Sequence, residues 1–285
     1  MTICICGAGT MGSGIAQVAA GAGFPTILFD VSEEAVQKAG EKMRKDLSVL
    51  VEKGKLSADK REQLLSNIRF TADLSSCIAD VVIEAIVEKM EVKVSLFRQL
   101  AGINTPDTIF ASNTSSLSIS ALAREISNPE RVAGLHFFNP APLMKLVEVV
   151  KGEQTSAAAV QQLVELTKTF GKTPVVCKDS PGFIVNRVAR PYYIESLRLA
   201  EEGTASYEVI DRLLESKGFK MGPFKLMDLI GNDINYAVSC SVYEQLGQPE
   251  RLKPSYLQKE KVDKGELGKK TGKGYYSPCP PKGET

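Results

Sequence analysis

A glycine-rich segment near the N-terminus constrains the fold more than any other feature of this sequence. Gly7-Ala8-Gly9-Thr10-Met11-Gly12 directly follows a short apolar run, Thr2 to Cys6, and precedes a helix-like stretch, Ser13 to Ala22. Gly23 favours the end of that helix, and Thr26 to Asp30 is typical of a second buried strand ending on an acidic residue. The order strand, glycine turn, helix, strand predicts a βαβ unit within the first 30 residues.

This turn has the spacing of a dinucleotide-binding fingerprint. Gly7 permits a tight turn, Gly9 lets backbone approach a pyrophosphate, and Gly12 allows close helix packing, while the helix N-terminus favours an anion. Asp30 could accept hydrogen bonds from both ribose hydroxyls and would repel a 2′-phosphate, which favours NAD over NADP. The alternatives are a structural glycine turn and a plain strand-end carboxylate. The predicted cofactor-binding residues here are Gly7, Gly9, Thr10, Met11, Gly12 and Asp30.

Helical and apolar segments alternate through the next part of the chain. Ser32 to Asn67 is charged and helix-like, with a break at Gly54 and Ser57 as a new N-cap, so we expect a helix pair projecting from the sheet. Strands alternating with helices predict an α/β fold with a Rossmann-type, doubly wound, mostly parallel sheet. The further expected strands are Val81 to Ile86, Ile109 to Ala111, Val132 to Phe137, Leu146 to Val150 and Thr173 to Cys177. The expected helices between them are Lys89 to Leu100, Ile119 to Ile126 and Ala157 to Phe170.

The pattern changes after Ser180. Strand signals disappear, and we expect Pro181 at the first helical position of a run of helices. We therefore predict an NAD-binding domain over residues 1–183 and an all-helical second domain over residues 184–285. Met221 to Val242 is more apolar than the core of a domain of about 100 residues requires, which predicts a homodimer through this domain.

Composition argues against several classes of function. The 285 residues are 43% hydrophobic and carry 35 Lys and Arg against 34 Asp and Glu, with the two signs interspersed, so a nucleic-acid partner is not expected. No segment resembles a membrane span or a signal peptide, and we expect a soluble, cytoplasmic protein. The six cysteines form no CxxC pair and no cluster with His, so neither a metal site nor a disulfide framework is expected.

His136 is the only histidine in the chain. A single histidine is often structural, but Glu148 lies twelve positions further on, across the turn-prone segment Asn139-Pro140-Ala141-Pro142. If the flanking strands pair as a hairpin centred on Pro142, the imidazole and the carboxylate lie opposite each other. In such a dyad the carboxylate selects the tautomer and supports the imidazolium, which suits general acid–base catalysis.

Six further blocks form a specific pattern when taken together and in order. They are Val82 to Glu88, Ala111 to Leu117, His136 to Pro140, Lys145 to Val150, Asp179 to Arg187 and Lys270 to Tyr276. With the glycine fingerprint, they make the chain closely resemble the L-3-hydroxyacyl-CoA dehydrogenase family, particularly its short bacterial members called 3-hydroxybutyryl-CoA dehydrogenases. The resemblance runs essentially from end to end.

The resemblance implies an oxidoreductase that reversibly oxidises an (S)-3-hydroxyacyl-CoA, such as short-chain 3-hydroxybutyryl-CoA, to a 3-oxoacyl-CoA with NAD. It implies that His136 is the general acid/base and that Glu148 orients it. Ser115 and Asn186 would then contact the substrate near the reacting carbon and the thioester. Hydride transfer develops charge on the substrate oxygen, which such donors can stabilise.

The resemblance also implies cofactor contacts outside the fingerprint. Asn139 would lie beside the nicotinamide, and Glu88 and Lys93 match family positions near the nicotinamide ribose. Lys270 matches a position in the C-terminal block. The alternative for Ser115 and Asn186 is a structural role, as a turn serine and a helix-start asparagine.

The projecting helix pair of the family helps to hold coenzyme A. Lys53 matches a coenzyme A contact, whereas Asp46 stands where some members have a contacting serine and would repel phosphate. A solvated helix face is the alternative for the other charges of this segment, Lys55 included. Two other functions stay open: a non-catalytic NAD-binding or structural protein, and a 3-hydroxy-acid dehydrogenase of the group related to 6-phosphogluconate dehydrogenase. That group typically relies on a catalytic lysine. The pattern of His136 and Glu148 favours a 3-hydroxyacyl-CoA dehydrogenase over both of these alternatives.

Overall fold

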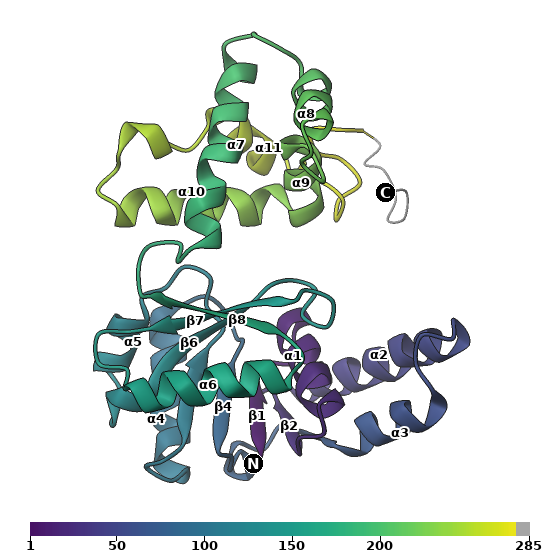
Figure 1. The fold of residues 1–285 in the computed structure, drawn as a ribbon, viewed down its shortest axis with the longest axis vertical. Coiled ribbons are helices and arrows are strands. Elements are labelled where there is room, and N and C mark those ends of the chain that lie inside the picture. The colour runs from purple at the N-terminus through teal and green to yellow at the C-terminus, as the bar shows by residue number, and fades with distance from the viewer. Residues whose placement is uncertain (278–285) are drawn as a thin grey trace. The chain divides into compact units, whose positions relative to one another are not determined.

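The structure, a computed structural model, describes residues 1–277; Cys279 lies outside the described residues. The chain divides into two compact units, Met1–Ser180 and Pro181–Thr285 (Figure 1). We describe each by itself. Among the described residues, no helix has the length and apolar character needed to cross a membrane.

The first unit is built on an eight-stranded sheet with the order β3-β2-β1-β4-β5-β6-β7-β8. The strands from β3 across to β6 run parallel, β7 is antiparallel to β6, and β8 is parallel to β7. The predicted doubly wound, mostly parallel sheet is confirmed. The strands are β1 (Ile3–Cys6), β2 (Thr26–Phe29), β3 (Ile68–Thr71), β4 (Val81–Glu84), β5 (Ile109–Ser112), β6 (Val132–Phe137), β7 (Leu146–Lys151) and β8 (Thr173–Lys178).

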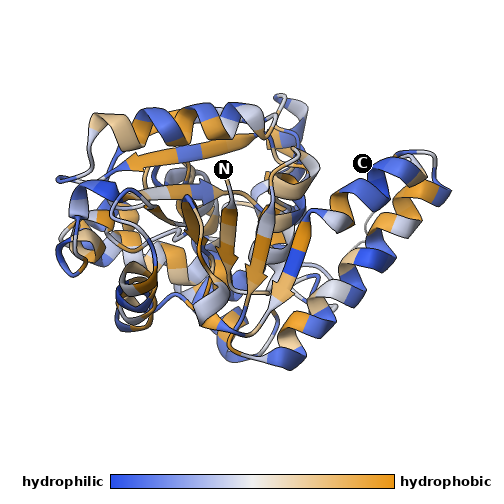
Figure 2. Cartoon of the chain, turned by 90° about the horizontal axis from the view of Figure 1, so that it is seen from below, coloured by the Kyte–Doolittle hydropathy of each residue, from blue (hydrophilic) through white to orange (hydrophobic). Residues whose placement is uncertain are grey.

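Alternate strand residues bury their side chains on opposite faces of this sheet. Ile3 and Ile5 belong to one apolar core, and Cys4 and Cys6 belong to the other. Most strand residues in Figure 2 are accordingly hydrophobic, whereas the covering helices carry both hydrophobic and hydrophilic residues. The first face is covered by α1 (Thr10–Gly21), α2 (Glu33–Glu52), α3 (Ala58–Ser66) and α6 (Ala157–Thr169). The second is covered by α4 (Met90–Ile103) and α5 (Ile119–Arg124), and single 3-10 turns occur at η1 (Leu74–Ser76) and η2 (Pro129–Arg131).

The predicted helix pair is confirmed and extends away from the sheet (Figure 1). Ser32 caps α2 by accepting a hydrogen bond from the Ala35 backbone N–H at 3.2 Å, and Ser57 caps α3 in the same way. Gly54 separates the helices with a φ of +64°, a left-handed conformation that glycine adopts without strain.

Strand β3 was not predicted from the sequence. Only Ile68 of its four residues is buried, because β3 forms an edge of the sheet and half of its surface faces outward. An edge strand needs no continuous apolar run, and so its pattern lacks the signal that marked the central strands.

The described part of the second unit is helical, as predicted, but its first helix begins at Val185 and not at Pro181. Gly182 and Phe183 have φ values of +74° and +48°, so the chain turns before the helix can start. The helices are α7 (Val185–Glu201), α8 (Tyr207–Ser216), α9 (Pro223–Ile230), α10 (Asn232–Gln245) and α11 (Tyr256–Asp263), with a 3-10 turn at η3 (Glu250–Leu252).

Two buried aspartates connect the helices of this unit to its last described segment. Asp228 accepts hydrogen bonds from the backbone N–H groups of Tyr275 and Tyr276 at 2.9 and 3.0 Å. Asp211 accepts from the Phe224 N–H at the start of α9, at 2.9 Å, and from the Tyr276 hydroxyl at 2.7 Å. These carboxylates therefore hold segments that are distant in sequence.

Candidate active site

The glycine turn between β1 and α1 leaves room where a dinucleotide pyrophosphate would need it. A Cβ placed on Gly7 would lie 2.6 Å from the Ala85 carbonyl oxygen, and one on Gly12 would lie 1.7 Å from the Gly7 carbonyl oxygen. By contrast, nothing lies within 4 Å of a Cβ placed on Gly9. Packing therefore explains Gly7 and Gly12, and the space beside Gly9 remains open for a ligand.

The first turn of α1, which begins with Thr10 and Met11, receives no side-chain cap from Gly9. Its N–H groups suit an anionic group. Asp30 follows β2 beside this turn, where its Oδ2 accepts a hydrogen bond from the Ala8 N–H at 2.8 Å and its Oδ1 accepts from the Ser32 N–H at 3.1 Å. An open glycine position, an uncapped helix and a fixed carboxylate together fit NAD.

Polar side chains gather at the carboxyl ends of β4, β5 and β6. The register pairs Glu84 with Ser112 and Ser112 with Gly134, and His136 lies two residues beyond Gly134 on the same face. This is the face covered by α4 and α5. Ligands of open α/β sheets bind at the carboxyl ends of the strands, so these groups lie at the edge where chemistry is expected.

The predicted pairing of His136 with Glu148 is confirmed. The two residues are register partners in the β6–β7 hairpin, and His136 Nδ1 lies 2.7 Å from Glu148 Oε2. The imidazole side chain is 7% exposed and the carboxylate 1%, with the Phe138 ring packed at 4.6 Å. With Nδ1–H donating this hydrogen bond to the carboxylate, Nε2 is the ring nitrogen suited to exchange a proton with a substrate.

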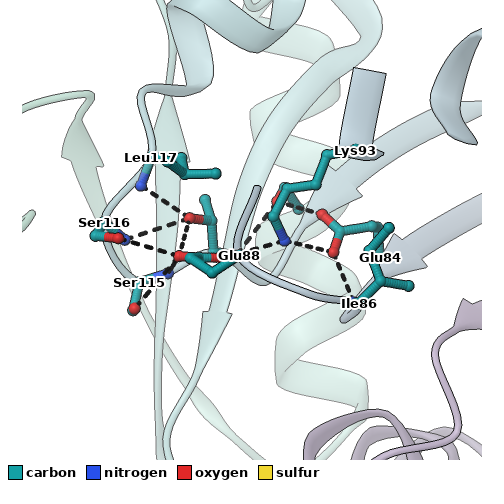
Figure 3. Close-up of polar contacts among 9 residues, drawn as sticks. Glu84, Ile86, Glu88, Lys93, Ser115, Ser116 and Leu117 are labelled. Carbon is teal, nitrogen blue, oxygen red and sulfur yellow. Dashed lines mark hydrogen bonds and ion pairs between the residues drawn. The ribbon is translucent and has the colours of Figure 1, made fainter. Parts of the chain in front are cut away.

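A second cluster joins two carboxylates to one buried ammonium (Figure 3). Lys93 Nζ lies 2.6 Å from Glu84 Oε1 and 3.1 Å from Glu88 Oε2. Glu84 is fully buried and also accepts from the Ile86 N–H at 2.8 Å and from the Ser112 hydroxyl at 2.7 Å. Glu88 is 38% exposed, so one end of the cluster reaches the surface.

Glu88 also holds the loop that follows β5. Its Oε1 accepts from the Thr114 hydroxyl at 2.5 Å and from the Ser115 N–H at 3.0 Å, while the Ser115 hydroxyl lies at 3.4 Å (Figure 3). Burial would raise the pKa of Glu88, but the charge of Lys93 and the hydrogen bond from Thr114 outweigh it and hold that pKa below its ordinary value. The ionised carboxylate thus positions the predicted substrate contact Ser115.

The remaining predicted residues lie in several places. Asn139 is exposed in the loop between β6 and β7, and Lys53 is exposed at the C-terminus of α2. Asn186 and Lys270 belong to the second unit. The Asn186 carbonyl in the first turn of α7 accepts from Arg190 Nε at 3.0 Å, and Lys270 forms a 2.5 Å ion pair with Asp233.

The contacts of Glu84 and Ser112 were not predicted from the sequence, although both residues lie in the blocks that carry the family resemblance. A carboxylate at the end of a fully apolar strand, with a lysine nine residues further on, was the available signal. It was insufficient because spacing does not show that Lys93 turns from its helix toward the sheet.

Comparison with known proteins places both units in one family. The family model described as "3-hydroxyacyl-CoA dehydrogenase, NAD binding domain" matches residues 2–180, and that of the C-terminal domain matches residues 182–278. A 3-hydroxyadipyl-CoA dehydrogenase from Escherichia coli (strain K12) is 53% identical over 96% of this chain. This chain spans only 58% of the length of that relative.

Two further relatives are covered over almost their whole length. The mitochondrial hydroxyacyl-coenzyme A dehydrogenase of Sus scrofa is 44% identical over 96% of this chain and 90% of its own. The crystal structure of an (S)-3-hydroxybutyryl-CoA dehydrogenase from Ralstonia eutropha is similar with a TM-score of 0.93, at 40% identity over 97% of this chain and 98% of its own. With an NAD-binding first unit and a matching helical second unit, this chain belongs to the 3-hydroxyacyl-CoA dehydrogenase family.

Proposed function

We propose that this protein reversibly oxidises (S)-3-hydroxyacyl-CoA thioesters, of the short-chain type of 3-hydroxybutyryl-CoA, to 3-oxoacyl-CoA thioesters. The observation that carries the proposal is the buried 2.7 Å contact between His136 and Glu148 at the carboxyl end of an NAD-binding sheet. A non-catalytic protein of this fold would have no use for a buried imidazole with a dedicated carboxylate. A lysine-based 3-hydroxy-acid dehydrogenase would not need it either.

The bound cofactor would accept the hydride as NAD⁺ during oxidation and supply it as NADH during reduction. His136 Nε2 accepts the proton of the 3-hydroxyl group during oxidation and returns it during reduction, while Glu148 keeps Nδ1 protonated and stabilises the imidazolium. Ser115, held by Glu88, donates a hydrogen bond to the substrate oxygen on which charge develops. Asn186 contacts the substrate near the thioester.

The cofactor contacts follow from the same proposal. Gly9, Thr10 and Met11 would bind the pyrophosphate, and Asp30 would bind the adenosine ribose and exclude NADP. Glu88, Lys93 and Asn139 would contact the nicotinamide half, and Lys270 is a further proposed cofactor contact. A catalytic efficiency with NADPH equal to that with NADH would contradict the role of Asp30.

Coenzyme A binds against the α2–α3 pair, with Lys53 as a contact. Remote binding energy from the coenzyme then positions the acyl group for reaction. The charges on this surface favour phosphate binding only in part. Asp46 forms an ion pair with Lys42 and presents a carboxylate, which cannot donate a hydrogen bond to phosphate. Turnover of free 3-hydroxybutyrate at the rate of its thioester would remove this part of the proposal.

The protein is a cytoplasmic homodimer in this proposal. Leu229, Ile230 and Ile234 of the second unit are 45%, 39% and 51% exposed, an apolar surface that supports association. The described cysteines are all free thiols, which supports a reducing compartment. Light scattering at micromolar concentration tests the dimer, and a mass near the 30.9 kDa of one chain would count against it.

The decisive experiment is reduction of acetoacetyl-CoA by NADH, followed by loss of NADH absorbance. We expect turnover with the thioester, little with free acetoacetate, and little with NADPH. An enzyme that binds NADH but turns over no 3-oxoacyl-CoA of any chain length would overturn the proposed reaction.

A further inference from the structure

We propose that the cluster of Glu84, Lys93 and Glu88, called here the acidic triad, sets the relative affinity of this protein for NAD⁺ and NADH. This inference rests on the proposed function, because it concerns the cofactor of that reaction. The triad contains two carboxylates and one ammonium and therefore carries a net charge of −1. Glu84 is outside the set of residues that touch the reactants; it acts through Lys93 and is a positioning residue.

The contacts of the triad form a closed ring. Glu84 Oε2 accepts from the Ser112 hydroxyl at 2.7 Å, and the Thr114 N–H donates to the same hydroxyl oxygen at 3.2 Å. The Thr114 hydroxyl donates to Glu88 at 2.5 Å, and Lys93 closes the ring between the two carboxylates. A ring of this kind holds its charges in place without help from solvent.

The topology places the triad on the nicotinamide side. Asp30, directly after β2, marks the adenosine side of the glycine turn, and β1 separates β2 from β4 and β5. Glu84 ends β4, Glu88 lies in the loop that follows it, and Lys93 lies on α4. A dinucleotide that crosses the carboxyl ends of such a sheet has its other half over the latter strands. Two of the three charged side chains, Glu84 and Lys93, are at most 1% exposed, so water screens them little.

NAD⁺ and NADH differ by one positive charge, which is located on the nicotinamide ring, and their phosphates are the same. A fixed net negative charge nearby therefore stabilises the oxidised form relative to the reduced one. A unit charge acting over about 8 Å, at an effective dielectric constant of about 40, changes the ratio of the NAD⁺ and NADH dissociation constants by about fivefold. Glu148 adds to the negative charge on this face but is unchanged in the variants below.

The test is a series of variants that changes the charge of the triad in steps. Glu84→Gln raises the net charge by one, Lys93→Met lowers it by one, and the double variant restores the original value. The dissociation constants of NAD⁺, by calorimetry, and of NADH, by fluorescence, are measured for each. A direct contact between Lys93 and the cofactor would change both constants together and cancel in their ratio.

We expect the ratio of the NAD⁺ to the NADH dissociation constant to rise about fivefold in Glu84→Gln, fall in Lys93→Met, and return to within about twofold of wild type in the double variant. If Lys93→Met fails to fold because Glu84 is left buried without its cation, the other two variants still decide. Glu125→Gln is the matched control, since its ion pair with Arg98 is more than half exposed and its charge is screened.

An unchanged ratio in Glu84→Gln, or an equal loss of affinity for both forms in every variant, would show that the triad is only structural. If wild type binds neither form, both the proposed function and this inference fall. If wild type binds both forms but the ratio of their dissociation constants does not change with the charge of the triad, only this inference is wrong.

Discussion

Both units contain buried carboxylates, and the groups that bind them differ. In the first unit, Glu148 contacts an imidazole and Glu84 contacts an ammonium, both of which can exchange protons or carry charge. In the second unit, Asp228 and Asp211 accept mainly from backbone N–H groups, which cannot titrate. The partner of a buried carboxylate therefore distinguishes a chemical role from a structural one.

The largest effect should follow from removing the imidazole. His136→Gln keeps a hydrogen-bond donor for Glu148 but has no group that exchanges a proton near neutral pH, so kcat should fall by about a hundredfold or more. Steady-state rates in both directions and NADH binding are measured together. Retention of near wild-type kcat, under conditions where chemistry limits the rate, would return His136 to a structural role.

The matching change in the second unit should affect stability. Asp228→Ala leaves the N–H groups of Tyr275 and Tyr276 without their acceptor in a buried site, which should cost about 2 kcal/mol of unfolding free energy. Urea denaturation followed by circular dichroism measures the loss. Asp228→Asn, which keeps one acceptor oxygen, is the control and should cost less. Equal stability of Asp228→Ala and wild type would contradict the structural role of this carboxylate.

A smaller kinetic effect is expected when the carboxylate of the dyad is neutralised. Glu148→Gln can still contact His136 but no longer supports the imidazolium, so kcat should fall by about tenfold. In wild type the oxidation requires neutral His136 and the reduction requires the protonated form, so the pH profiles of the two directions should have opposite limbs. Profiles with limbs of the same sign in both directions would argue that another group exchanges the proton.

The smallest effects concern stability in acid, and they should have opposite signs in the two units. Lys93 and Thr114 hold the pKa of Glu88 below its ordinary value, despite the opposing effect of burial. Its contribution to stability is thus present above the unfolded-state pKa and is lost as pH falls through the lowered one. Burial raises the pKa of Asp211 despite the hydrogen bond from Tyr276. The folded state therefore holds that proton more tightly, and this contribution is lost as pH rises through the raised pKa.

Urea unfolding of wild type, Glu88→Gln and Asp211→Asn at about pH 3 and about pH 6 checks these signs. The advantage of wild type over Glu88→Gln should grow with pH, and its advantage over Asp211→Asn should shrink. Changes in the same direction for both variants would contradict the proposed electrostatic difference between the units.

Local patterns were sufficient for most of the first unit. The β1–α1–β2 order, the N-caps Ser32 and Ser57, and the hairpin that pairs His136 with Glu148 depend on spacings of a few residues, which sequence displays directly. The same reasoning failed at β3, whose pairing with β2 gives it strand structure without an apolar run, and at Pro181, where a turn at Gly182 and Phe183 delays the helix.

The sequence alone therefore determined the glycine turn, the alternation of strands and helices and the His136–Glu148 spacing, because each follows from residues close together in the chain. Only the tertiary structure decided that Lys93, on a helix, meets Glu84 from a strand and Glu88 from a loop, and that Glu88 holds Ser115 across 27 residues of sequence. The physical reason is that burial and charge pairing depend on which elements pack together. The spacing of charged residues shows neither the direction of a side chain nor the neighbours that neutralise it.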